Sequence, residues 1–135
     1  MPYPSPDPVP ADRHVFVYGT LRSGDDNDIT RLQPPARYVG MAQTPGTMHH
    51  LGRYPGVLLG GIGTIVGEVY AISADLERVL DEIEELYPQQ TNEYFKRHIT
   101  VAVDGNPVDC IVYEINPDYV LGKPVIASGD WCRDR

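Results

Sequence analysis

The chain has 135 residues, 41% of them hydrophobic, a length and composition that suit one folded domain with a single core. Its formal net charge of −8 repels phosphate backbones and anionic lipid, which argues against nucleic acid and membrane surfaces as partners. Because there is no membrane-spanning apolar run, no charged-then-apolar signal and only two cysteines, we expect a cytoplasmic protein without a disulfide scaffold.

The first 12 residues carry proline at nearly every second position, and we expect a flexible tail there, with the folded domain over residues 13–135. An apolar run from Val15 to Tyr18 then predicts a buried strand. Gly19 and Gly24 bound the loop that follows, and glycine permits positive φ and close approach of a ligand. Amides at such a bend can converge on a carboxylate or an oxyanion, and the alternative is an ordinary turn.

Short strands and turns are predicted for most of the remaining chain. The glycines at 60–63 do not form a phosphate-binding loop, because no lysine follows and a strand continues; we predict a hairpin turn. His49 and His50 are adjacent on an extended segment and point to opposite faces, so we expect one surface and one packed histidine instead of a metal site. The predicted elements are strands over residues 37–44, 47–51, 64–72, 94–103 and 108–115, a short helix or irregular segment over 25–32, and helical content near 118–121.

One long helix is predicted over residues 74–87, with Ser73 as its N-cap and Pro88 as its stop. Its apolar stripe consists of Leu76, Val79, Leu80, Ile83 and Tyr87. With about six or seven short strands, the chain is predicted to be an α+β protein: a small mixed or antiparallel β-barrel with this helix packed across it.

The acidic residues of this helix differ in their angle from the apolar stripe. At roughly 100° per residue, Glu84 lies about 90° from the stripe, whereas Asp81 and Glu85 lie about 150° away and are expected to face water. Glu77 and Glu82 lie only slightly further off than Glu84. A carboxylate at the edge of the core is partly desolvated, which raises its pKa toward the range of a general acid or base. Periodicity therefore favours Glu84, by a small margin.

Other reactive residues have structural interpretations. Cys110 lies within an apolar strand and is expected to be a buried small hydrophobe, and Cys132 has no recognisable histidine partner. Trp131 is expected to pack as a lid. Arg22 and Arg97 are expected to pair with surface acids, with binding of a substrate carboxylate as the alternative.

Five motifs follow one another along the chain. The first is Val17-Tyr18-Gly19-Thr20-Leu21-Arg22, with Gly24 and Asn27 after it. The others are Gly67-Glu68-Val69-Tyr70, Leu80-Asp81-Glu82-Ile83-Glu84, Tyr94-Phe95-Lys96-Arg97 and Ile126-Ala127-Ser128-Gly129-Asp130-Trp131. This ordered set, over residues 14–131, resembles the gamma-glutamylcyclotransferase-like family.

The resemblance implies a pocket between the opening loop and the long helix. Glu84 matches the family's essential glutamate, and the glutamyl part of the substrate would be held by the backbone of Tyr18, Gly19, Thr20 and Leu21. Tyr94 and Tyr113 occupy positions similar to those of pocket-closing aromatic residues, and Arg22 is a further substrate-binding candidate. A glycine commonly follows the family's glutamate, whereas this chain has Glu85, which can repel an anionic substrate.

The implied reaction is intramolecular. The substrate's α-amine attacks its own γ-carbonyl and releases 5-oxoproline, with Glu84 as general acid and base and without metal or cofactor. The substrate would be a γ-glutamyl amine, a γ-glutamyl peptide or an acylated biosynthetic intermediate. Two further hypotheses stay open: a non-catalytic module that binds a carboxylate or γ-glutamyl ligand in the same pocket, and a structural protein in which the loop is only a turn.

Overall fold

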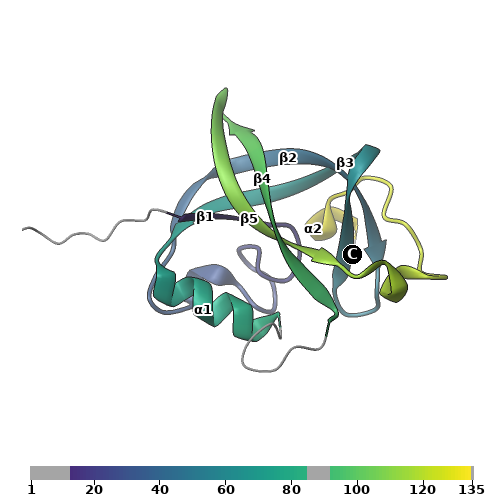
Figure 1. Ribbon diagram of the computed structural model, residues 1–135, viewed down its shortest axis with the longest axis horizontal. Helices are drawn as coiled ribbons and strands as arrows, with labels where there is room; N and C mark the ends of the chain where they lie inside the picture. Colours follow the sequence, from purple (N-terminus) through teal and green to yellow (C-terminus); the bar gives the residue numbers. More distant parts are fainter. Residues whose placement is uncertain (1–12, 85–91, 135) are drawn as a thin grey trace, which may run out of the picture.

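The computed structural model describes residues 13–84 and 92–134. It contains a five-stranded mixed sheet in the order β2-β3-β1-β5-β4 (Figure 1). The central strand β1 (Arg13–Val17) pairs antiparallel with β3 (Pro55–Ile72) and parallel with β5 (Asn106–Ile115). The outer strands are β2 (Arg37–His50), antiparallel to β3, and β4 (Tyr94–Val103), antiparallel to β5.

The prediction of a closed barrel is wrong. β2 and β4 are the two edges of the sheet, and Val103 of β4 packs directly on Gly40 of β2. Among the described residues no ladder of hydrogen bonds joins these two strands, so the sheet curls without closing.

Five strands form where six or seven were predicted, because β2 and β3 are long. Residues 37–44 and 47–51 were expected as separate strands, but β2 runs continuously to His50. The predicted hairpin turn at residues 60–63 lies inside β3, where Leu59 pairs with Gly46 and Thr64 pairs with Pro45. The four residues between them form a bulge, with Gly60 and Gly61 at φ 90° and 89° and Ile62 fully exposed.

The helix α1 (Ala74–Ile83) lies across one face of the sheet and is shorter than predicted (Figure 1). The Ser73 hydroxyl accepts a hydrogen bond from the Leu76 amide at 3.1 Å, which confirms the predicted N-cap. The helix ends at Ile83 with Glu84 as its C-cap. Its expected continuation through Tyr87 to Pro88 lies outside the described residues, as do the proline-rich segment 1–12 and Glu85.

Alternation along the strands divides the core into two clusters, one on each face of the sheet. Val15 and Val17 pack with Leu76 and Leu80 of α1, whereas Phe16 and Tyr18 point to the opposite face. The second cluster contains Trp131, which begins α2 (Trp131–Asp134) and is buried, as predicted for a packing lid.

The remaining elements are short. A 3-10 turn, η1 (Ile29–Arg31), lies in the segment where a short helix or irregular structure was expected, and η2 (Pro117–Val120) matches the predicted helical content. His49 and His50 are both half-buried, and the ring of His50 lies 5.0 Å from that of Trp131, so neither is a simple surface residue. Within the described residues no helix is long and apolar enough to cross a membrane.

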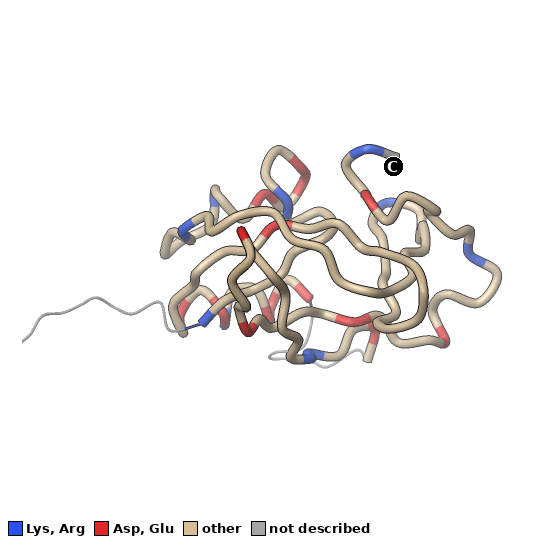
Figure 2. Tube along the Cα trace, turned by 90° about the horizontal axis from the view of Figure 1, so that it is seen from above, with Lys and Arg blue, Asp and Glu red and all other residues tan. Residues whose placement is uncertain are grey.

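The charged residues are mixed over the surface. Figure 2 shows acidic and basic positions interspersed along the visible trace, without a continuous stripe of Lys and Arg in the described part of the chain.

Candidate functional site

A cavity of about 180 Å³ lies where the loop after β1 meets the end of α1 and the beginnings of β3 and β4. The loop contributes Tyr18 to Leu21, and β5 contributes Tyr113. Glu84 lies on the wall formed by the end of α1, and Tyr94 lies on the wall formed by β4. The cavity therefore contains seven of the eight predicted site residues, and Arg22 is the one that does not line it.

The loop after β1 is held in shape by hydrogen bonds that use its carbonyl groups. The amides of Arg22, Asn27 and Ile29 donate to the carbonyl oxygens of Gly19, Thr20 and Leu21, each at 2.9 Å. The amides of Gly19, Thr20 and Leu21 take no part in these three bonds. Backbone N–H groups at such a bend can bind an anion, and for this loop that stays a prediction.

Glycine is needed at position 19 for space and at position 24 for conformation. A Cβ on Gly19 would lie 2.8 Å from Cγ of Pro55, so the loop approaches β3 too closely for a side chain. Gly24 has φ of 88°, the left-handed conformation that glycine adopts at little cost. The predicted positive φ is thus confirmed at Gly24, while Gly19 serves close packing.

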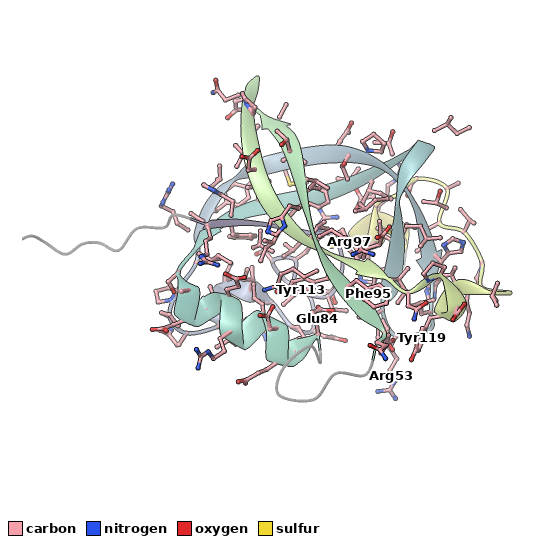
Figure 3. The ribbon with its side chains drawn as sticks, in the orientation of Figure 1. Arg53, Glu84, Phe95, Arg97, Tyr113 and Tyr119 are labelled. Atoms are coloured by element: carbon pink, nitrogen blue, oxygen red, sulfur yellow. The ribbon has the colours of Figure 1, made fainter. Side chains whose placement is uncertain are left out.

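Glu84 enters the cavity because α1 ends there. Its amide makes the last helical bond, to the Leu80 carbonyl at 2.9 Å, and its ψ of 3° leaves the helical range. The residue is half-buried, and Figure 3 shows it beside Tyr113, at the end of α1 and beneath β4 and β5. Among the acids of α1 and its C-cap, Glu84, which the periodicity favoured, is therefore the one that lines the cavity.

Three buried tyrosines surround this carboxylate. The hydroxyl of Tyr18 donates to the Tyr113 carbonyl oxygen at 2.6 Å, and the hydroxyl of Tyr94 donates to the Pro55 carbonyl oxygen at 3.0 Å. Burial raises the pKa of all three hydroxyls, and the negative charge of Glu84 raises each further. These tyrosines therefore stay protonated at neutral pH and act as hydrogen-bond donors rather than bases.

Behind Tyr113 lies an ion-pair network that the sequence analysis missed. The Tyr113 hydroxyl donates to Oδ1 of Asp81 at 2.8 Å, and Lys96 Nζ contacts Asp81 at 2.9 Å and Glu77 at 2.6 Å. Arg13 also pairs with Glu77. Asp81 was expected to face water, and this is wrong because a basic side chain on β4 covers that flank of the helix. Two acids one helical turn apart, opposite a strand with a lysine, are the signal that could have indicated the network.

Arg22 is a buried structural residue. Its guanidinium contacts Glu68 Oε2 at 3.0 Å and Asp130 Oδ1 at 2.7 Å, and only 6% of the residue is exposed. Burial opposes its charge, but the hydrogen bonds to both carboxylates outweigh this effect and raise its pKa. Arg22 is thus not among the residues that line the cavity. Arg97 instead forms the expected surface pair, with Glu114 at 2.9 Å.

Two further residues at the cavity, Tyr54 and Glu93, carried no signal in the sequence. The Tyr54 hydroxyl donates to Glu93 Oε2 at 2.6 Å, and the Tyr54 ring lies 6.4 Å from that of Tyr94. Both residues lie just outside strands, in turn segments where side-chain direction does not follow from periodicity. Within residues 13–84 and 92–134 no group of three or more His, Cys, Asp or Glu is arranged to hold a metal ion.

Comparison with known proteins shows the family of this chain. The family model described as gamma-glutamyl cyclotransferase, AIG2-like, matches residues 15–133. A putative gamma-glutamylcyclotransferase of Vibrio cholerae is 33% identical over 121 residues, which cover 88% of this chain and 95% of that protein. The gamma-glutamylaminecyclotransferase of Bos taurus is 34% identical over 113 residues. The match covers 73% of this chain but 63% of the bovine protein, which is less than two thirds of its length.

A solved structure shows the same fold. The crystal structure of an AIG2-like protein from Mus musculus superimposes with a TM-score of 0.70 and is 30% identical, over 87% of this chain and 88% of that one. The family model matches nearly all of the described residues, from β1 to α2, and the Vibrio relative is matched over 95% of its own length. This chain therefore belongs to the gamma-glutamyl cyclotransferase, AIG2-like family.

Proposed function

We propose that this protein is a γ-glutamyl cyclotransferase that converts a γ-glutamyl amine or peptide into 5-oxoproline and a free amine. The observation that carries the proposal is the cavity that Glu84 shares with the backbone of Gly19, Thr20 and Leu21. The name of the bovine relative, a gamma-glutamylaminecyclotransferase, supports an amine as the leaving group.

The reaction requires folding of the substrate and transfer of two protons from the α-ammonium nitrogen to the leaving nitrogen. The α-amine nitrogen attacks the γ-carbonyl carbon, a new C–N bond closes the five-membered ring, and the original amide C–N bond breaks. Holding both groups of one molecule at contact distance supplies much of the rate enhancement. No oxidant, water or second substrate enters the balance.

Glu84 is assigned the proton transfer. Its carboxylate takes one proton from the substrate ammonium before the attack and a second from the same nitrogen after it, and delivers them in turn to the leaving nitrogen, which departs as an ammonium. The three tyrosine hydroxyls around it remain protonated, so Glu84, and not one of these tyrosines, is the group that accepts the proton. The amides of Gly19, Thr20 and Leu21 are assigned to the substrate α-carboxylate or to the oxyanion that develops on the γ-carbonyl.

The test compares Glu84→Gln with Glu82→Gln, since Glu82 is an exposed acid on the same helix. We expect 5-oxoproline release from a panel of γ-glutamyl amides to fall by about 100-fold or more in Glu84→Gln, the scale of a lost general acid or base. Glu82→Gln should retain the wild-type rate.

Ligand binding separates catalysis from recognition. A γ-glutamyl amide should still raise the melting temperature of Glu84→Gln, because that ligand binds only the folded protein. A wild-type protein that binds the amides without releasing 5-oxoproline would instead be a non-catalytic binding module with the same pocket.

A further inference from the structure

The three buried tyrosines at the cavity each donate their hydroxyl proton to an acceptor within the protein. Tyr18 and Tyr94 donate to backbone carbonyl oxygens, whereas Tyr113 donates to a side chain, Oδ1 of Asp81 at 2.8 Å. A tyrosine hydroxyl has a single proton, and its oxygen can also accept a hydrogen bond. Toward a ligand in the cavity, the oxygen of each of these hydroxyls can therefore act only as an acceptor.

The direction of the bond between Tyr113 and Asp81 is fixed by Lys96. Lys96 and Tyr113 are paired residues of β4 and β5, so their side chains lie on the same face of the sheet. Both contact Asp81 on α1, because Lys96 Nζ donates to Oδ2 at 2.9 Å and the Tyr113 hydroxyl donates to Oδ1. An ammonium can only donate and an ionised carboxylate can only accept, so the proton between Asp81 and Tyr113 comes from the tyrosine.

This tyrosine lies on the same wall of the cavity as Glu84. Asp81 does not line the cavity itself, but it lies in the last turn of α1, three residues before Glu84. Figure 3 shows Tyr113 beside Glu84. Burial and the neighbouring Asp81 raise the pKa of the Tyr113 hydroxyl, and the charge of Glu84 raises it further. A cationic group that contacts Glu84 therefore lies close to the oxygen of Tyr113.

We propose that Asp81 is a positioning residue that makes the Tyr113 oxygen a hydrogen-bond acceptor for the substrate's α-ammonium. This inference rests on the proposed function, in which the α-ammonium contacts Glu84. One N–H of the ammonium binds Glu84, and a second binds the Tyr113 oxygen. When Glu84 removes the first proton, the second hydrogen bond keeps the nitrogen in place while its lone pair attacks the γ-carbonyl carbon.

The variant Asp81→Asn should reverse the hydrogen bond to Tyr113. Lys96 can only donate, so it retains the oxygen of the new side-chain amide, and the NH2 group of that amide donates to the Tyr113 oxygen. The oxygen is then occupied, and the hydroxyl proton competes with the substrate ammonium. We expect kcat/KM for 5-oxoproline release from the γ-glutamyl amide of butylamine to fall about tenfold or more, the scale of one hydrogen bond to a charged group.

An analogue without the α-amine separates positioning from the shape of the cavity. N-Butylglutaramate has the carboxylate and the amide of that substrate but no α-amine, so it can inhibit and cannot cyclise. Its inhibition constant in Asp81→Asn should stay at the wild-type value. A substitution that merely distorted the cavity would weaken the substrate and the inhibitor alike.

Two further variants assign the effect to the Asp81–Tyr113 bond. Tyr113→Phe removes the hydroxyl and should also lower kcat/KM without weakening the inhibitor, and it remains informative if Asp81→Asn does not fold. Adding Asp81→Asn to Tyr113→Phe should cause no further loss, because both act on one hydrogen bond. Glu77→Gln alters the other acidic partner of Lys96 and keeps the Asp81–Tyr113 bond, so it should retain the wild-type kcat/KM below its melting temperature.

The possible failures are distinct. The positioning role is overturned by wild-type kcat/KM in Asp81→Asn or Tyr113→Phe, by an equal weakening of the inhibitor, or by a further loss in the double variant. Each of these results leaves the cyclotransferase activity in place. Absence of 5-oxoproline from every γ-glutamyl amide tested with the wild-type protein overturns the proposed function, and the positioning role falls with it.

Discussion

Glu84 illustrates how a small difference in angle along a helix becomes a functional difference. Helical periodicity places Glu84 about 90° from the apolar stripe, only slightly closer to the stripe than Glu77 and Glu82. What distinguishes it is the end of α1 at Ile83, which lets the chain turn and brings the carboxylate to the cavity. A helix predicted to continue to residue 87 does not reveal that turn.

Arg22 is the residue whose placement most changes its interpretation. A basic side chain next to a candidate anion site suggests substrate binding, and nothing in the local sequence shows that Glu68 and Asp130, 46 and 108 residues further along, converge on it. Helix and strand periodicity cannot predict such long-range pairing. Glu68 also accepts hydrogen bonds from the Ser23 amide and the Tyr70 hydroxyl, so Arg22 anchors the loop to β3.

The variant Arg22→Met should lose stability and not substrate recognition. It leaves the buried Glu68 carboxylate without its cation, and we expect the free energy of unfolding to drop by about 3 kcal/mol. Arg97→Met, which breaks the half-exposed pair with Glu114, should cost about 0.5 kcal/mol in the same urea titration. If Arg22→Met kept wild-type stability and had a raised KM, Arg22 would instead be a substrate-binding residue.

For the secondary-structure elements, local sequence patterns predicted where strands lie better than which strands pair with each other. Residues 60–63 have the composition of a hairpin turn, yet the chain leaves β2 at Leu59 and returns to the same strand at Thr64. Glycine permits either outcome, and only the pairing partner decides between a turn and a bulge. The open sheet has the same origin, because closure depends on a ladder between β2 and β4 that no local pattern encodes.

The attachment of α1 to the sheet should depend on pH through Glu77. Burial raises the pKa of Glu77, but the hydrogen bonds and charges of Lys96 and Arg13 outweigh it and lower that pKa below its ordinary value of 4.5. The unfolded chain therefore takes up this proton first as the pH falls, so the stability that Glu77 supplies is present above pH 4.5 and is lost progressively below it.

The variant Glu77→Gln tests this link between helix and strands. It should lose about 2 kcal/mol of stability at neutral pH, because Lys96 and Arg13 lose a charged partner. Its free energy of unfolding should then change less than that of the wild type as the pH falls below 4.5. Glu82→Gln, on the exposed face of the same helix, should keep the wild-type pH dependence. Parallel curves for Glu77→Gln and wild type would contradict the assignment.

For the whole molecule, the sequence predicted most where several motifs matched one family together. The loop after β1, Glu84, Tyr94 and Tyr113 are distant in sequence, and it is the resemblance to one family that predicted their common pocket. Physical patterns alone supplied the strand, the helix and one favoured carboxylate. Tyr54 and Glu93, which belong to turn segments, were outside the reach of both approaches.

The cluster of core residues on the face opposite α1 should open only when the whole sheet unfolds, and Cys110 reports on it. Burial, with a smaller contribution from Asp109, raises the pKa of its thiol to about 12, so almost no reactive thiolate exists at neutral pH. Cys132 is exposed in α2. A thiol reagent should therefore modify Cys132 quickly and Cys110 only through unfolding.

The variant Cys132→Ser isolates the buried thiol. The labelling rate of Cys110 in this variant should rise with urea in proportion to the unfolded population measured by circular dichroism. In the double variant with Glu84→Gln, a γ-glutamyl amide should slow the labelling of Cys110, because a ligand held between α1, the loop and β4 stabilises the folded molecule as one unit. Two results would show that the two faces of the sheet unfold separately. One is labelling of Cys110 as fast as that of Cys132. The other is a Cys110 labelling rate that stays the same when a ligand raises the melting temperature.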